Sequence, residues 1–254
     1  MRNRAKLIEQ LESYRQTYNS DEGFRPESSD RVLMAWIFHD NLLEGRTFKP
    51  EEIQAALRRE DHLMPSYLRP LLEDIRSYES AISMIGRWAK KGPSQLNLTN
   101  LETLHKHLMK PEPKEGARLR KNSPVHRDYH HEICSHRDVP KKLDALFEEI
   151  QTFDVLKDDV LSFAARLHHQ LMYIYPYRRQ PGTLARLFTN QFLISNGYPP
   201  LILASHERGH YYDALATHNC AALAQLFYQA AWRYLDSIFS TSSKLRSSSS
   251  KYAM

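Results

Sequence analysis

The chain is poor in the residues that build disulfide-rich and tightly turned proteins. It has two cysteines and eight glycines among 254 residues. Cys134 and Cys220 are too few for a disulfide framework, and they lack the C-x-x-C spacing of a metal or redox motif. Most of the 13 prolines separate helical stretches, so tight hairpins are expected to be rare. This composition favours a mainly α-helical protein of a reducing compartment.

Long apolar runs are also missing. No segment approaches the roughly 20 consecutive apolar residues that a membrane span needs. The first residues, MRNRAKLIEQ, lack the apolar stretch of a secretory signal. We therefore expect a cytoplasmic protein without a membrane partner. The net charge of +5 favours attraction to phosphates, acidic proteins or nucleic acid without selecting among them.

Apolar residues recur at helical spacing along most of the chain. Thr99 and Glu102 have the spacing of a capping box that would open one of the expected helices. Helices are predicted at Asn3–Tyr18, from near Asp30 to Glu44, from Pro50 onward, at Leu68–Lys91, at Leu101–Met109 and from Pro140 onward.

Two segments break this helical pattern. Residues 115–137 lose the periodicity and are rich in Arg, Lys, His and Pro, so a long exposed loop or hairpin is expected there. Residues 241–254 are rich in serine and have too little apolar content to repay the entropy of ordering. We expect this second segment to be a tail that is either helical only at its start or held by contacts with other parts of the protein.

The most informative stretch runs from Leu171 to Pro200. An apolar helix leads into a loop with arginines, and a second amphipathic helix follows and ends near Gly197. The loop and the helix start read YPYRRQPGTLAR, from Tyr175 to Arg186. This frame resembles the signature HPFxDGNGRxxR of the Fic (fido) family.

Other segments resemble that family in the same register. The helix expected at Leu101–Met109 and the segment from Glu115 resemble a Fic helix and its substrate-docking hairpin, the flap. GHYYDALATHN, at Gly209–Asn219, resembles the helix that lines the nucleotide pocket. The resemblance implies a Fic-type helical domain at residues 96–238 with a short β-hairpin flap. An N-terminal helical extension would occupy residues 1–90. The serine-rich tail would occupy residues 241–254.

Active Fic enzymes, as the family is understood, usually transfer AMP from ATP to a protein side chain. The motif histidine takes the proton of the target hydroxyl, the acidic residue holds Mg²⁺, the Gly/Asn turn cradles phosphates and two arginines position the nucleotide. Of the eight specified motif positions, this chain keeps two, Gly182 and Arg186, and Tyr177 is a conservative third. Thr183 replaces the first arginine.

The base and the metal ligand are both replaced. Tyr175 stands at the histidine position, and only on the order of one unperturbed tyrosine in a thousand is deprotonated at neutral pH. We expect a buried tyrosine that holds the loop, with a direct role, such as accepting a transferred group, as the alternative. Arg179 stands at the acidic position and would repel Mg²⁺, so no metal is expected. Arg178 and Arg179 are either phosphate ligands or solvated surface arginines.

The phosphate-binding turn is also altered. Gln180 and Pro181 stand where the family has glycine and asparagine. Pro181 has no N–H to offer an anion, and Gln180 would pay for a positive φ. Because proline suits the first helical position, we expect this turn to be an ordinary helix start.

HDNLLEGR, at His39–Arg46, resembles the inhibitory helix motif [ST]xxxE[GN] that many Fic proteins carry. Glu44 and Gly45 fit, whereas Asp40 sits where serine or threonine is expected. The resemblance implies that Glu44 pairs with Arg186 and joins the extension to the core domain. Both a structural and an autoinhibitory role remain open for this pair.

The remaining polar clusters have weaker signals. Tyr211 and Tyr212 match family positions near the adenine, with core packing as the alternative, and His168 and His169 are expected to pack or cap. The flap histidines match no common zinc spacing and are expected to be exposed; they are His126, His130, His131 and His136, close to Cys134. Basic residues with one aromatic, Tyr129, leave nucleic acid as a further partner; they are Arg118, Arg120, Lys121, Arg127 and Arg137.

The leading hypothesis is a Fic-family protein with a degenerate active site. It would be unable to AMPylate by the usual mechanism and would act as a binding or regulatory protein with a protein partner. The alternative is an altered Fic-type transferase that moves AMP or another phosphate-containing group onto a protein hydroxyl. In that case ATP or another nucleotide would bind without Mg²⁺. Arg178, Arg179 and Arg186 would take over the contacts that the metal ion makes in the family.

Overall fold

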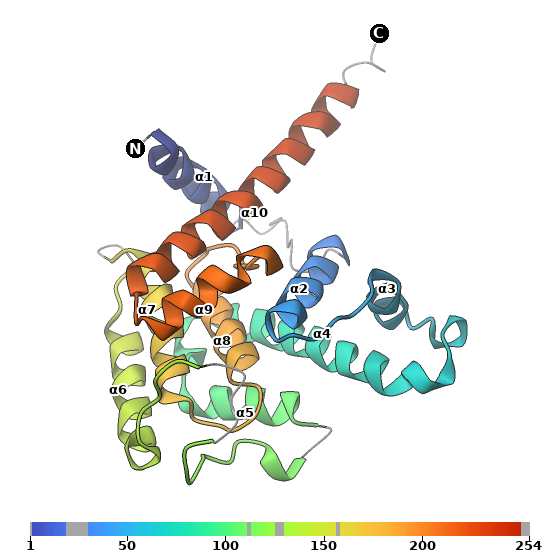
Figure 1. Ribbon diagram of the computed structural model, residues 1–254. Coiled ribbons are helices and arrows are strands. Elements are labelled where there is room, and N and C mark those ends of the chain that lie inside the picture. The colour runs from blue at the N-terminus through green and yellow to red at the C-terminus, as the bar shows by residue number, and fades with distance from the viewer. Residues whose placement is uncertain (1, 19–29, 111–112, 125–129, 156–157, 250–254) are drawn as a thin grey trace.

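The computed structural model describes residues 2–18, 30–110, 113–124, 130–155 and 158–249. Within these ranges the protein is almost entirely helical, as predicted (Figure 1). The helices are α1 (Arg2–Tyr18), α2 (Asp30–Leu43), α3 (Pro50–Arg58), α4 (Arg69–Ala89), α5 (Leu98–Leu108), α6 (Val139–Thr152), α7 (Val160–Ile174), α8 (Pro181–Ser195), α9 (Arg208–Ala216) and α10 (Cys220–Ser249). Short 3₁₀ turns connect several of them. None of the described helices is long and apolar enough to cross a membrane.

Helix α8 lies at the centre of the fold. Every residue from Pro181 to Ile194 is buried, so this helix has no solvent-facing side apart from its last residue, Ser195. Helices α4, α5 and α7 pack around it, and α10 covers the outer side of α7. One continuous apolar core runs from Leu7 on α1 to Leu235 on α10. The N-terminal helices therefore share a core with the rest of the chain.

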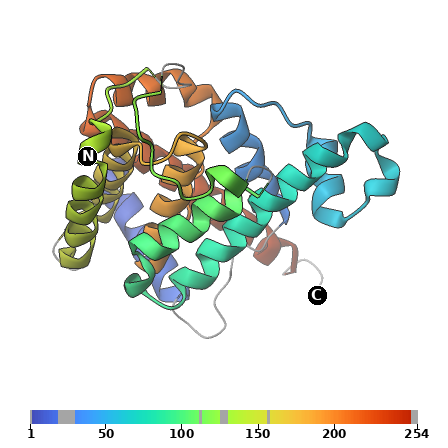
Figure 2. The same ribbon diagram turned by 90° about the horizontal axis from the view of Figure 1, so that it is seen from below.

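The periphery is less compact than this centre. Helix α2 packs on α3 and α4, and α1 packs against α10. Figures 1 and 2 show that α3 and the first turns of α4 protrude from the body. The last part of α10 also extends beyond the other helices (Figure 1).

The predicted end of α8 near Gly197, at the turn Gly197–Pro200, is found in the structure. The Gly197 N–H donates to the Ile194 carbonyl at 3.0 Å and the Tyr198 N–H to the Leu193 carbonyl at 2.9 Å. Gly197 has a φ of 75°, a conformation that costs glycine less than other residues. The buried Asn190 side chain bonds both backbone groups of Leu201, which ties the turn back onto α8.

Two local predictions are wrong. Helix α5 begins at Leu98, and its cap is Asn97, whose side chain accepts from the Asn100 N–H at 2.9 Å. Thr99 therefore lies inside the helix and does not open it. The tail is also helical further than expected, because α10 continues to Ser249. Residues 250–254 lie outside the described part of the chain.

The β-hairpin expected at the flap is not confirmed. In the described part of residues 115–137 no strand forms, and one isolated antiparallel bridge joins Leu119 to Tyr177 of the motif loop. The segment is also less exposed than predicted, because Arg120, His131 and Cys134 are buried. His126, Arg127 and Tyr129 lie outside the described residues.

Candidate functional site

The loop from Tyr175 to Gln180 connects α7 to the buried helix α8. Both of its ends adopt left-handed backbone conformations, with φ values of 47° at Tyr175 and 55° at Gln180. Such a conformation costs a residue with a side chain on the order of 1 kcal/mol or more, so the surroundings must hold it. The positive φ expected at Gln180 is thus present, and Pro181 is the first residue of α8. Tyr175 is buried, with 2% of its surface exposed.

Arg120 holds the first half of this loop. Its guanidinium donates from Nε to the Tyr175 carbonyl at 2.8 Å and from Nη2 to the Ile174 carbonyl at 3.2 Å. Its backbone N–H donates to the Pro176 carbonyl at 3.0 Å. A cation is favourable here because the C-terminal end of α7 carries the negative end of the helix dipole. The residue predicted to be exposed on the flap is therefore an anchor of the motif loop.

His105 of α5 holds the second half of the loop. Its Nδ1 accepts from the Ala117 N–H at 2.8 Å, so its Nε2–H donates to the Arg179 carbonyl at 3.1 Å. Its ring stacks on Tyr177 with the centroids 4.0 Å apart. Burial lowers the pKa of His105 to about 4, which keeps the ring neutral as both contacts require. No motif in the sequence points to His105, but its place beside Leu101, Leu104 and Leu108 on the buried face of α5 marks it as a core residue.

Arg186 lies in a buried cluster with two carboxylates. Its Nη2 donates to Asp40 Oδ2 at 3.1 Å, and its Nε donates to the other oxygen of the same carboxylate. The Nη2 group also donates to Glu44 Oε1. The side chains of the three residues are 5 to 6% exposed. Asp40 is on α2 and Glu44 directly follows its last residue, Leu43. The Glu44 N–H still donates to the Asp40 carbonyl at 3.3 Å, so the helical spacing continues and both side chains lie on one side. The structure thus brings Glu44 to Arg186, as the resemblance implied, and adds Asp40 as a second partner.

The charges of this cluster do not cancel. Two carboxylates face one guanidinium, and burial raises the pKa of Asp40 while Arg186 acts in the opposite direction. Burial and the Asp40 carboxylate also raise the pKa of Tyr78. Removing Arg186 would leave the buried carboxylates without a cation, at a cost of about 3 to 5 kcal/mol. The cluster therefore resists separation of α2 from α8.

Tyr211 and Tyr212 of α9 are both engaged near this cluster. The Tyr211 hydroxyl accepts from Arg186 Nη1 at 3.3 Å and lies 2.9 Å from His168 Nε2. Burial and the nearby Arg186 charge lower the pKa of His168 to about 3, so its ring is neutral. Tyr212 donates to the carbonyl of Leu43, the last residue of α2. The two tyrosines thus connect α9 to the same arrangement of α2 and α8.

The candidate phosphate ligands do not share one environment. Arg178 and Arg179 are exposed, whereas Arg186 is buried, and Gly182 lies in the buried first turn of α8. Gly45 follows α2 with a φ of 75°. The exposed pair and the buried arginine therefore have different neighbours and different access to solvent.

The buried flap residues are tied to the end of α7. The His131 Nε2–H donates to the Met172 carbonyl at 2.8 Å, and the Cys134 N–H donates to the Tyr173 carbonyl at 2.9 Å. His130 is exposed and His136 half-buried. Across the described ranges, no three His, Cys, Asp or Glu side chains are grouped so that they could hold a metal ion.

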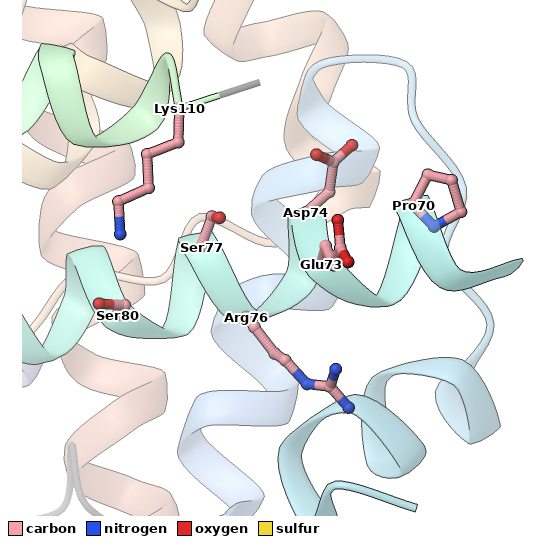
Figure 3. A pocket seen from close by; sticks show the side chains of 7 residues that line it. All are labelled: Pro70, Glu73, Asp74, Arg76, Ser77, Ser80 and Lys110. Carbon is pink, nitrogen blue, oxygen red and sulfur yellow. The ribbon is translucent and has the colours of Figure 1, made fainter. Parts of the chain in front are cut away.

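A hollow of about 450 Å³ lies elsewhere, along the outer face of α4 (Figure 3). No residue that lines it belongs to the motif loop or to the Arg186 cluster. The lining residues are Pro70, Glu73, Asp74, Arg76, Ser77, Ser80 and Lys110.

Comparison with known proteins connects the motif loop to a family. Residues 95–193, from just before α5 to near the end of α8, match the Fic/DOC family model. The chain contains a Fic domain. The curated relatives it resembles include the protein adenylyltransferase Fic of Nematostella vectensis, with 24% identity over 186 residues, and protein adenylyltransferase fic-1 of Caenorhabditis elegans, with 22% over 197 residues. The alignments cover 72% and 74% of this chain but only 42% and 37% of those relatives.

Solved Fic structures share the fold. Fic-1 of C. elegans (residues 134–508) superposes with a TM-score of 0.73 at 17% identity, covering 93% of this chain and 71% of that one. A Fic-domain signalling protein of Bacteroides thetaiotaomicron gives 0.72 at 19% identity, covering 90% and 95%. At this identity the likeness establishes the fold alone. In this Fic domain, Tyr175 is buried at the end of α7, and Arg186 of α8 is bound by Asp40 and Glu44.

Proposed function

We propose that this Fic-domain protein does not transfer AMP by the family's usual route and acts instead as a binding or regulatory protein. The observation that carries the proposal is the cluster in which Asp40 and Glu44 both bind Arg186. In the family this arginine positions the nucleotide. Here a nucleotide would have to displace two buried carboxylates before it could use Arg186.

The cost of that displacement is large compared with ordinary nucleotide affinity. Freeing a buried ion pair costs about 3 to 5 kcal/mol, which corresponds to a loss of about 150-fold or more in Kd. An affinity of about 1 μM would then become weaker than about 0.1 mM. The closed cluster therefore opposes nucleotide binding in the resting protein.

The motif residues support the same proposal. Tyr175 replaces the general base, and it is buried with its backbone carbonyl bound by Arg120. A phenol with an ordinary pKa near 10 is a poor base at neutral pH, and a buried one has no access to a target hydroxyl. Arg179 replaces the acidic Mg²⁺ ligand and is exposed. Neither proton removal nor metal binding has its usual group.

The second candidate is an altered transferase that moves AMP or another phosphate-containing group onto a protein hydroxyl. Two observations favour it, namely the curated relatives named as protein adenylyltransferases and the retained Gly182 and Arg186. Both candidates share three further proposals. The chain is divided into an extension, a core domain and a tail, the protein is cytoplasmic, and it has a protein partner.

A transfer assay with labelled ATP separates the two candidates. We expect no Mg²⁺-dependent labelling of the protein itself or of proteins in a lysate, either for the natural chain or for an Asp40→Ala/Glu44→Ala variant. Asp30→Ala, an exposed carboxylate on the same helix, is the matched control. Robust labelling by the natural chain would contradict the proposal. Labelling only by the double variant would show an inhibited transferase instead of a binding protein.

A further inference from the structure

The bridge between the flap segment and the motif loop brings two arginines opposite each other. Leu119 pairs with Tyr177 in antiparallel fashion, and the Arg120 N–H donates to the Pro176 carbonyl at 3.0 Å. In this register the neighbouring pair of residues is Arg118 and Arg178. Residues directly opposite each other in an antiparallel pair have Cβ atoms about 5 Å apart.

The two arginines face outward from the bridge. Tyr177 is 1% exposed and stacks on His105, so its side of the bridge faces the interior. Arg118 and Arg178, by contrast, lie at the surface. Both are exposed, as is Lys121 a few residues further along the flap segment. Arg118 and Arg178 form the flap–loop basic site, and Lys121 follows close by in the sequence.

The positive charge of this site is not balanced locally. Within the described ranges, the side chains of Arg118, Arg178 and Lys121 take part in no ion pair. Like charges opposite each other in an antiparallel pair are destabilising. An unbalanced, solvent-facing arginine pair is suited to an anion.

We propose that the flap–loop basic site binds the phosphate group of a phosphorylated protein segment without a metal ion. Two guanidinium groups can each make paired hydrogen bonds to phosphate oxygens, and a phosphate monoester carries up to two negative charges. Recognition of phosphorylated segments by arginine clusters follows the same chemistry. The inference rests on the proposed binding role and names the chemistry of the partner.

A protein segment fits this surface better than a single-stranded nucleic acid. Binding of single strands depends on exposed aromatic side chains on which bases stack. In the described part of the chain the large exposed hydrophobic side chains are Leu63 and Tyr67, which lie just before α4 and not on the flap. Arg178 is also separate from the buried Arg186, so this site does not depend on opening the Arg186 cluster.

The test measures binding of a labelled peptide library with a central phosphoserine and degenerate flanks. The same library with serine and a single-stranded DNA of equal charge are the other probes, each titrated with Mg²⁺ and with a chelator. We expect the phosphoserine library to bind best, with no effect of the chelator. Arg118→Glu/Arg178→Glu should weaken that binding by about tenfold or more, because it removes charge-assisted hydrogen bonds.

Matched controls keep the result interpretable. Arg58→Glu/Arg87→Glu changes two exposed arginines of α3 and α4 by the same charge and should change the affinity less than about twofold. Arg118→Lys/Arg178→Lys keeps the charge but loses the paired bonds, and should give an intermediate affinity. Thermal melting of each variant verifies folding.

Three outcomes would overturn the inference. They are equal affinity for the phosphorylated and unphosphorylated libraries, tighter binding of the DNA, and a loss of affinity that the control variant reproduces. None of them bears on the Arg186 cluster, which is tested with nucleotide and the Asp40 and Glu44 variants. Failure of this inference and failure of the proposed function are therefore distinguishable.

Discussion

Two buried arginines hold the motif region of this Fic domain, and they do so with different partners. Arg186 binds the carboxylates of Asp40 on α2 and of Glu44 just beyond it, whereas Arg120 binds carbonyl oxygens at the end of α7. The first contact joins two specific side chains that a motif can encode. The second uses backbone oxygens that any sequence supplies. Arg186 therefore ties α8 to the end of α2, and Arg120 holds the loop that follows α7.

The largest expected effect comes from removing Arg186. Arg186→Ala leaves Asp40 and Glu44 buried without their cation, so the free energy of unfolding should fall by about 3 to 5 kcal/mol. Urea denaturation monitored by circular dichroism measures it. Replacing all three together, in Arg186→Met/Asp40→Leu/Glu44→Leu, should recover most of the loss because no buried charge remains. A single variant as stable as the natural protein would show that the cluster is not closed in solution.

The pH dependence of stability tests how the motif loop is held, because His105 binds the same loop as Arg120. Since burial lowers its pKa from 6.5 to about 4, the neutral ring stabilises the fold fully above about pH 6.5. That contribution, up to about 3 kcal/mol, is lost as the pH falls from 6.5 through 4. His168 titrates in the same direction, with a pKa lowered to about 3. A His105→Phe variant should show a shallower decline between pH 6.5 and 4, and an unchanged profile would refute the loop-holding role.

Arg120→Ala should have a smaller effect than loss of Arg186, because it leaves carbonyls and not charges without a partner. We expect a loss of about 2 to 3 kcal/mol in the free energy of unfolding. Arg118→Ala, two residues away and exposed, should stay within about 0.5 kcal/mol. Equal effects of the two substitutions in the same denaturation experiment would contradict the anchoring role of Arg120.

The smallest effect concerns the start of α5, the helix that carries His105. Asn97→Ala removes the side-chain cap and should cost about 1 kcal/mol in thermal or urea unfolding. Thr99→Ala at an exposed position inside the helix should cost about 0.5 kcal/mol or less. A larger loss of stability for Thr99→Ala than for Asn97→Ala would show that Thr99 is the capping residue.

The helices could be predicted from sequence because their buried faces repeat at helical spacing. Tyr14 on α1, Trp36 on α2 and Phe192 on α8 are all buried. The exact ends of the helices were harder to predict from the sequence. Asn97 and Thr99 are both good caps, and only the position of α5 against its neighbours decides between them. The serine-rich end of α10 continues a helix that begins in an apolar segment, which composition alone does not indicate.

The sequence predicted the contact between two side chains of the candidate site. It did not predict the contacts that side chains make with backbone carbonyls. The motif led to Glu44 and Arg186, and the positive φ at Gln180 followed from its place in the turn. Burial of Arg120 and His131 did not follow, because a segment without periodicity gives no sign of which side chain turns inward. The inhibitory, nucleotide-binding and partner roles remain predictions.

The most direct test of the central claim is calorimetric titration of ATP into the natural protein and into Asp40→Ala/Glu44→Ala, with and without Mg²⁺. The account predicts no measurable binding to the natural protein and Mg²⁺-independent binding to the double variant that is lost again when Arg186 is also changed to Ala. ATP binding to the natural protein as tight as to the double variant would contradict the claim that Asp40 and Glu44 close the site.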